Sequence, residues 1–133
     1  MRYLLDTNVC IRYLQGRLPA IRNAIRSQKP DAIVICAVVR AELFYGAMKS
    51  QSPAETLTKQ RQFIDRFPTL PFDDSAAMIF GKIRADLHRQ GNPIGPYDLQ
   101  IAAIALVNNL ILVTHNSREF SRIEGLQLAD WEI

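Results

Sequence analysis

Short apolar runs alternate along the chain with longer segments in which apolar residues recur at every third or fourth position. The continuous runs at residues 3–5, 32–35 and 111–113 predict strands, and the β-branched run at 32–35 is typical of burial on both faces. Residues 69–72 and 126–128 are weaker strand candidates, and the proline in the first of them favours a sheet edge. The pattern therefore predicts four or five short strands.

Helical periodicity fills the intervals between these runs. Helices are predicted at residues 9–15, 20–28, 38–49, 53–66, 76–90 and 99–107, with a turn or short helix at 116–120. The helix at 99–107 is apolar nearly all round, so we expect it to be buried, with Asp98 at its start. Strands that alternate with helices imply an α/β fold whose mostly parallel central sheet is flanked by helices.

The composition is that of an ordinary globular protein, with 133 residues, 48% apolar and 22% charged. It predicts one domain over residues 1–133 and excludes disordered, collagen-like and repeat architectures. The apolar run before the first acid is too short for a signal peptide, and residues 101–113 are too few to span a membrane. The two cysteines are expected to be buried thiols of a cytoplasmic protein.

Polar side chains follow the predicted strands where parallel α/β sheets place their functional crevice. Asp6 directly follows the first strand, Glu42 lies in the helix after the second, Asp98 opens the buried helix, and Asn116 follows the strand at 111–113. Asp6 and Asp98 could be simple N-caps, each worth about 1 kcal/mol, and Asn116 a turn residue. Glu42 lies among apolar residues, so we expect a cation near it.

Together these positions predict a divalent metal site, because converging carboxylates repel unless a hard cation such as Mg²⁺ or Mn²⁺ neutralises them. A zinc site is disfavoured, since His88 lies in an amphipathic helix and His115 stands alone. The chain has no glycine-rich phosphate loop followed by Lys and Ser or Thr, and its serines and cysteines lack partners for a catalytic triad.

Four segments carry a resemblance to a known family. Residues 3–8 (YLLDTN), 41–46 (AELFYG), 95–102 (GPYDLQIA) and 113–120 (VTHNSREF) resemble, in order, the four motifs of the PIN-domain ribonucleases, and the closest likeness is to the VapC toxins of bacterial toxin–antitoxin pairs. The loop at residues 91–98 also resembles the branch described as tRNA(fMet)-specific endonucleases.

The resemblance implies a metal-dependent endoribonuclease toxin. It implies Asp6 and Asp98 as direct ligands of Mg²⁺ or Mn²⁺, and Glu42 as a ligand or a base that orients water. Asn116 stands where many members carry a fourth Asp, which removes one negative charge and leaves a polar orienting group. Thr7 and Asn8 match positions that can support the ligands or contact substrate.

The expected partners are RNA, with tRNA implied by the loop likeness, and, by family resemblance, a cognate antitoxin and a second copy of the chain. The net charge is +3, and setting the three acids aside leaves 13 − 3 = 10 acidic against 16 basic residues, of which 12 are Arg. The candidates for RNA contact are Arg12, Arg84, Arg89, Arg118 and Arg122.

Two other functions stay open at this point. The first is an RNA-binding or protein-binding module that keeps the fold without turnover, because Asn116 replaces an acid. The second is a small phosphatase that uses Asp6 as a nucleophile. It is weakened because Thr7 and Asn8 follow Asp6, and the second acid that such phosphatases use two residues further on is missing.

Overall fold

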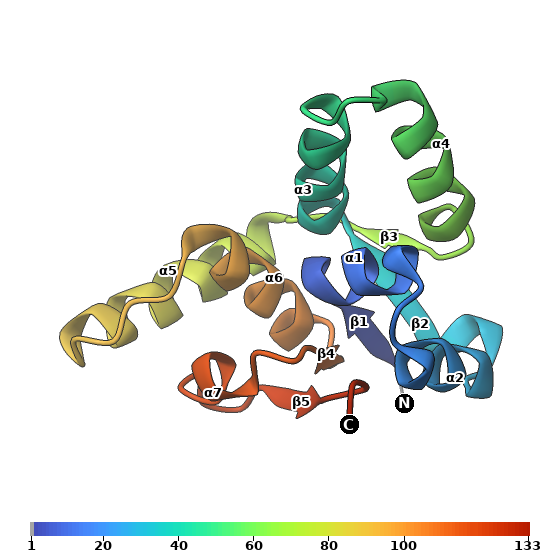
Figure 1. Ribbon diagram of the computed structural model, residues 1–133. Helices are drawn as coiled ribbons and strands as arrows, with labels where there is room; N and C mark the ends of the chain where they lie inside the picture. The colour runs from blue at the N-terminus through green and yellow to red at the C-terminus, as the bar shows by residue number, and fades with distance from the viewer. Residues whose placement is uncertain (1) are drawn as a thin grey trace.

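The computed structural model describes residues 2–133, and its five strands form one parallel sheet in the order β3-β2-β1-β4-β5 (Figure 1). The strands are β1 (Tyr3–Leu5), β2 (Ile33–Cys36), β3 (Thr69–Leu70), β4 (Ile111–Val113) and β5 (Gln127–Ala129). The predicted α/β fold with a parallel sheet is confirmed, and β3, which ends directly before Pro71, is an edge strand as expected. Met1, the first residue of the predicted domain, lies outside the described residues.

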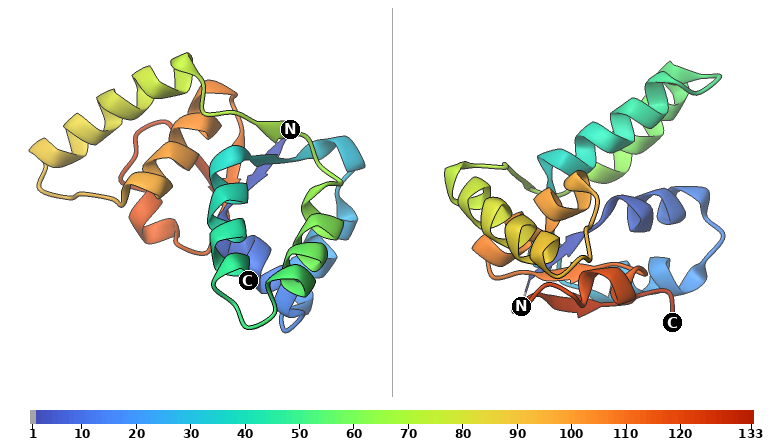
Figure 2. Two further views of the ribbon diagram at one scale, coloured as in Figure 1. Left: turned by 90° about the horizontal axis from the view of Figure 1, so that it is seen from above. Right: turned by 90° about the vertical axis from the view of Figure 1, so that its left-hand side faces the viewer.

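Seven α-helices and one 3₁₀ turn connect these strands within residues 2–133. They are α1 (Thr7–Gln15), α2 (Pro19–Ser27), η1 (Pro30–Ala32), α3 (Ala37–Met48), α4 (Pro53–Ile64), α5 (Asp74–Arg89), α6 (Pro96–Val107) and α7 (Ser117–Phe120). Helices α3 and α4 form a hairpin that projects from the sheet, and α5 packs along α6 on another side of the molecule (Figure 2). Each long predicted helix is present, with ends that differ by at most three residues.

The core has its centre where the sheet meets the buried helix α6. All four residues of β2 are buried, and α6 buries six of its twelve residues. Cys10 and Cys36 are free and buried as expected, and burial raises the pKa of Cys36 to about 11, so this thiol is protonated at neutral pH.

Helix α6 begins earlier than the sequence pattern predicts. Its first residue is Pro96, whose fixed φ suits the first helical position, so Asp98 lies inside the first turn and is not the capping residue. An acidic side chain in a first turn interacts favourably with the helix dipole. The expectation that Asp98 opens the helix is therefore wrong, although it still lies at the N-terminal end of α6.

The strand order reverses direction at β1, which has β2 on one side and β4 on the other. The chain reaches β4 only after a crossover that contains α5 and α6. In open parallel sheets, ligands bind beyond the carboxyl ends of the strands at such a switch point. The ends of β1 and β4 are joined by a hydrogen bond from the Asp6 amide to the Val113 carbonyl, at 3.1 Å.

Across residues 2–133, every helix is too short or too polar to cross a bilayer.

Candidate functional site

A polar cleft of about 380 Å³ opens at the switch point between α1, α3 and α6. Its lining residues are Asp6, Thr7, Asn8, Ile11, Glu42, Tyr45, Gly46, Lys49 and Asp98. Three carboxylates from distant parts of the sequence therefore share one cleft. A larger cavity of about 740 Å³ lies between α5 and the C-terminal end of α6, and its lining contains none of these three acids.

Asp6 lies between β1 and α1, where it is buried and hydrogen-bonded. Only 5% of the residue is exposed, and its Oδ1 accepts a 2.8 Å hydrogen bond from the amide of Val9. It therefore does cap α1, as the simpler interpretation proposes. Burial raises the pKa of Asp6, and the nearby charges of Glu132 and Glu42 raise it further, while the Thr114 hydroxyl and the Val9 amide act in the opposite direction.

Glu42 reaches the cleft from α3 and is tied to the first residue of α1. The Thr7 hydroxyl donates a 2.6 Å hydrogen bond to Glu42 Oε1, across 35 positions of sequence. No ion pair within residues 2–133 includes Glu42, so the expected cation is not a Lys, Arg or His side chain of the described part of the chain. The Glu42 side chain is partly exposed and accepts the hydrogen bond from Thr7, so its carboxylate is not buried without a partner among the apolar residues of α3.

Asp98 carries the clearest electrostatic signature in the cleft. Its pKa is raised to about 6, first by burial and then by the charges of Glu119, Glu42 and Asp6. The carboxylates of Asp6, Glu42 and Asp98 thus lie within electrostatic reach of one another. They do not form a closed cage, since none of them belongs to a group of three ligand atoms within 4.8 Å in the described part of the chain.

This donor set fits a hard divalent cation. Mg²⁺ and Mn²⁺ prefer carboxylate oxygen and water, and they commonly bind to one or two carboxylates while keeping several waters. Burial is the main cause of the raised pKa of Asp6 and of Asp98, and the charges of neighbouring acids raise both further, as expected for carboxylates that converge without a cation. A bound cation would reverse that repulsion.

A pH dependence of stability follows from Asp98. Its pKa in the folded protein is about 6, above the ordinary value of 3.8, so the folded state holds the proton more tightly than the unfolded state does. Stability from this group is therefore present at low pH and is lost as pH rises from about 4 to 6. We expect the melting temperature of the metal-free protein to fall more steeply over this window than that of Asp98→Asn, when both are measured by circular dichroism. Equal slopes for the two proteins would contradict the assignment.

Asn116 lies outside the lining of the cleft and acts on a neighbouring acid. Its side-chain amide donates a 2.6 Å hydrogen bond to Glu119 Oε2, and its backbone amide bonds to the Thr114 hydroxyl at 3.0 Å. Among the neighbouring charges, that of Glu119 raises the pKa of Asp98 most. The sequence analysis did not single out this acid. Asn116 caps α7, which has only four residues, so no periodic pattern in the sequence indicates that Glu119 lies beside it.

Lys49 and Tyr45 are further cleft residues that the sequence analysis missed. The Lys49 ammonium lies 4.8 Å from the centre of the Tyr45 ring, and 67% of Tyr45 is exposed. Glu42, Tyr45 and Lys49 are spaced by three and four positions, so they share one face of α3, with Lys49 directly after its last turn. That spacing could have identified them.

The five arginines proposed for RNA contact lie outside the lining of the acid cleft. Arg12 pairs with Glu132 at 3.3 Å, Arg89 pairs with Asp86 at 2.8 Å, and the Arg84 guanidinium lies against a phenylalanine ring. Arg118 is exposed on α7, and Arg122 lines the larger cavity beside α5. Any contact with RNA through these residues would therefore lie outside the lining of the acid cleft.

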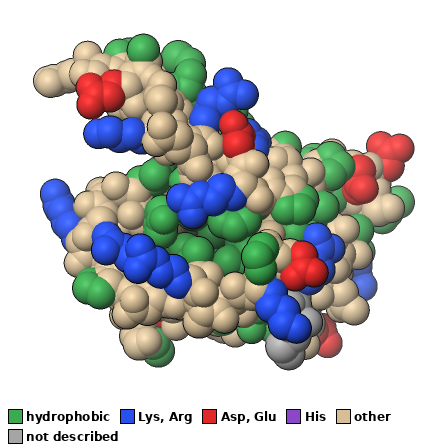
Figure 3. Space-filling model, turned by 90° about the vertical axis from the view of Figure 1, so that its right-hand side faces the viewer, with side chains coloured by type: hydrophobic (Ala, Val, Ile, Leu, Met, Phe, Trp, Pro, Cys, Tyr) green, Lys and Arg blue, Asp and Glu red, His purple; other side chains and the backbone are tan. Residues whose placement is uncertain are grey.

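An apolar hollow lies beneath the α3–α4 hairpin, with Lys and Arg side chains around it (Figure 3). Between α1 and α4 its lining residues are Ile11, Leu14, Gln15, Thr56, Lys59 and Gln60. Ile11 also lines the acid cleft, so the two concave surfaces adjoin.

Comparisons with known proteins agree with this geometry. The PIN domain family model matches residues 3–126. The chain is 40% identical over 131 residues to the tRNA(fMet)-specific endonuclease VapC of Shigella flexneri and 36% identical to Ribonuclease VapC2 of Haemophilus influenzae, with 98% of each chain covered. The crystal structure of DNA-bound VapBC from Salmonella typhimurium has a chain that superposes with a TM-score of 0.93 at 40% identity, with 98% of both chains covered. For VapBC-1 from nontypeable Haemophilus influenzae the TM-score is 0.89 at 35% identity, again over 98% of both chains.

Proposed function

This chain belongs to the PIN-domain family and to its VapC ribonucleases, and on that premise we propose that it hydrolyses RNA phosphodiester bonds with Mg²⁺ or Mn²⁺ held by Asp6, Glu42 and Asp98. The observation that carries the proposal is the convergence of these acids in one cleft at the β1–β4 switch point. The raised pKa of Asp98 supports it, since a cation is the natural partner for acids that repel one another.

The chain's own residues divide the work of such a reaction. A bound divalent cation would supply Lewis-acid activation of the phosphodiester and of a water molecule. Asp6 is fixed by its capping hydrogen bond, so it presents its second oxygen to the cleft at little cost in side-chain entropy. Glu42 has one oxygen held by Thr7, and its other oxygen is free to orient water or accept a proton.

Asn116 and Glu119 lie outside the lining of the cleft and act on the proposed site through the charge of Glu119. The hydrogen bond between them fixes the Glu119 carboxylate, whose charge acts on Asp98. Asn116 thus serves as a polar orienter without carrying a charge, and Glu119 supplies the acid near the fourth motif. Thr7 supports Glu42, and Asn8 is exposed at the cleft, where it can contact substrate.

We assign the RNA backbone to the side of the cleft occupied by Lys49 and Tyr45. Lys49 is the one basic side chain in the lining of the cleft, among the described residues, and Tyr45 offers an exposed ring on which a base can stack. Because the chain is similar to the named endonuclease, we propose tRNA as its substrate.

Lys49→Gln should weaken cleavage of any RNA by the same factor, whereas Lys29→Gln, at an exposed position outside the cleft, should not.

The proposed protein partners are an antitoxin and a second copy of the chain. Relatives with solved structures form VapBC complexes, which supports an antitoxin partner for this chain. The apolar hollow between α1 and α4 is the surface that we assign to it, because it adjoins the acid cleft through Ile11. An antitoxin bound there would reach the catalytic acids and block access of RNA.

The direct test is to incubate the purified protein with total tRNA in Mg²⁺ or in EDTA and to map the cut ends. We expect a small set of specific cuts in Mg²⁺ and intact RNA in EDTA. Intact RNA at every metal concentration, from a folded and monodisperse protein, would overturn the proposal and favour a binding module. Release of phosphate from a monoester without RNA cleavage would overturn it in favour of a phosphatase.

A further inference from the structure

A second cluster of metal-ligand side chains lies at the ends of β4 and β5. His115 is two residues beyond β4, Asp130 directly follows β5, and Glu132 is three residues beyond the end of β5. The parallel register places Val113 opposite Ala129, so both segments leave the sheet at the same edge. Among residues 2–133, His115, Asp130 and Glu132 are the group in which three such ligand atoms lie within 4.8 Å of one another.

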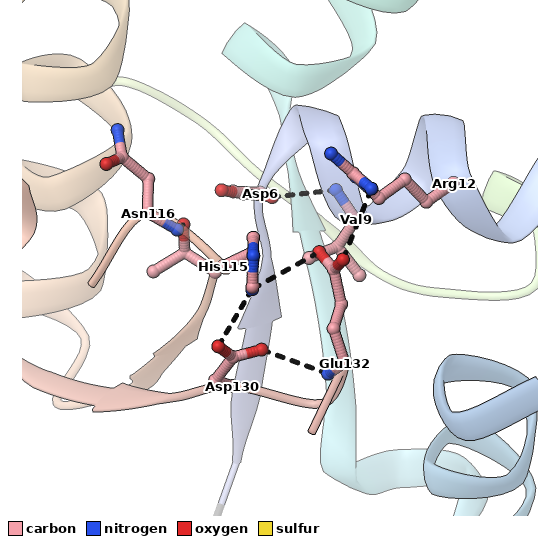
Figure 4. A network of polar contacts seen from close by, with 8 residues as sticks. Asp6, Val9, Arg12, His115, Asn116, Asp130 and Glu132 are labelled. Carbon is pink, nitrogen blue, oxygen red and sulfur yellow. Dashed lines mark hydrogen bonds and ion pairs between the residues drawn. The ribbon is translucent and has the colours of Figure 1, made fainter. Parts of the chain in front are cut away.

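The three side chains point toward one position (Figure 4). His115 Nδ1 lies 2.9 Å from Asp130 Oδ2 and 4.0 Å from Glu132 Oε2. Bonds from Zn²⁺ to nitrogen and carboxylate oxygen are about 2.0–2.2 Å long and tetrahedral, which sets ligand atoms roughly 3.3 Å apart. The two separations from His115 lie on either side of that value, and the two carboxylate oxygens lie within 4.8 Å of each other, so the three atoms are close to the spacing of a metal site.

Both carboxylates are pre-oriented by donors that occupy their other oxygens. The backbone amide of Glu132 donates to Asp130 Oδ1 at 2.9 Å, which leaves Oδ2 directed at His115. The Arg12 guanidinium pairs with Glu132 Oε1 at 3.3 Å, which leaves Oε2 directed at the same nitrogen. Support of this kind, from groups behind the ligands, is what orients ligands in protein metal sites.

An independent observation comes from the burial of Glu132. Its side chain is only 6% exposed, and Oε2 is one of two fully buried side-chain oxygens or nitrogens without a hydrogen-bond partner in the described part of the chain. Arg12 pairs only with the other oxygen of this carboxylate, and a buried carboxylate oxygen without a hydrogen-bond partner is unfavourable. The oxygen is directed into the cluster, so a cation between it and His115 would satisfy it.

We propose that His115, Asp130 and Glu132 form a structural site for a zinc-type divalent cation, separate from the acids of the cleft. One imidazole nitrogen and two carboxylate oxygens suit Zn²⁺, whereas Mg²⁺ prefers oxygen alone. The His115 side chain is 52% exposed, which leaves room for water as a fourth ligand. Asn116 points away from this cluster, and none of its three residues lines the acid cleft (Figure 4).

A cation at this site would stabilise the position of the segment that follows β5. It links the segment after β5 to the loop before α7, and through Arg12 it is connected to α1. The sequence argument against zinc rested on the isolation of His115, and the parallel pairing of β4 with β5 removes that isolation. The expected consequence of Zn²⁺ binding is a higher melting temperature.

The test uses Zn²⁺ alone as the probe, titrated calorimetrically into metal-stripped full-length protein that carries Asp6→Asn and Asp98→Asn. We expect one equivalent to bind and to raise the melting temperature, with excess Mg²⁺ failing to displace it. His115→Ala or Glu132→Gln in that background should weaken binding at least tenfold, and His88→Ala, which removes the other histidine of the chain, should not.

Two outcomes would overturn the site. One is Zn²⁺ affinity that is unchanged by both His115→Ala and Glu132→Gln, with folding verified by circular dichroism. The other is loss of Zn²⁺ binding when only Asp6 and Asp98 are replaced, which would assign the bound ion to the cleft. Neither result depends on RNA cleavage, so this inference and the proposed nuclease activity stand or fall separately.

Discussion

Replacement of Asp6 by Asn should reduce RNA cleavage by at least about 10²–10³-fold, the range found when a group that stabilises transition-state charge is removed. The substitution should leave the fold intact for a structural reason. Asn is as good a helix cap as Asp, so the hydrogen bond from the Val9 amide can be kept. Burial raises the pKa of Asp6, which means that its ionised form is disfavoured in the folded protein.

The melting temperature of Asp6→Asn in the absence of metal should therefore equal or exceed that of the unmodified protein at pH 7. Cleavage of tRNA in Mg²⁺, followed by mapping of the cut ends, measures the activity. Asp31→Asn is a matched control, because Asp31 is an exposed acid in η1 outside the cleft. Cleavage by Asp6→Asn at the rate of the control would remove Asp6 from the catalytic site.

Replacement of Phe63 by Ala should lower the free energy of unfolding by about 3–5 kcal/mol, a large share of the roughly 5–15 kcal/mol available to a domain. Phe63 is 1% exposed on α4. Its ring stacks on Tyr13 of α1 at 4.1 Å and meets Phe67 edge-on at 5.3 Å. The substitution would leave a cavity where the hairpin joins the rest of the fold.

Urea denaturation with a two-state fit measures this effect through the transition midpoint. Met78→Ala is the matched control, because Met78 is 75% exposed on α5 and its loss should change stability by less than about 0.5 kcal/mol. A change below about 1 kcal/mol for Phe63→Ala would show that α4 contributes little to the folding of the chain.

The sheet was predictable from sequence because its strands are buried on both faces. Such strands leave continuous apolar runs, and β2 and β4 coincide with two of them to within one residue. The start of α6 was predicted wrongly because Asp98 looks like a cap, whereas Pro96 already has the backbone conformation of a first helical residue. Asp98 as a cap and Pro96 as a first helical residue predict different helix starts, and the helix begins at Pro96.

The candidate site was predictable in part for a similar reason. Residues that follow parallel strands converge by topology, so Asp6, Glu42 and Asp98 could be grouped without coordinates. The hydrogen-bond partner of Glu42 could not be predicted, because no local pattern indicates that Thr7, 35 positions away, lies beside it. Glu119 was missed because α7 is four residues long, too short to show a periodic pattern.

The pairing of β1 with β4 also has a consequence for biosynthesis. Asp6 leaves the ribosome well before Val113, where the strand that completes its side of the sheet ends, more than 100 positions further along the sequence. At about 5–20 residues per second, several seconds of translation separate the two. A partially synthesised chain therefore carries the first acid without the neighbouring strand and helix that complete the cleft, and the nuclease activity proposed here begins only after β4 has been synthesised.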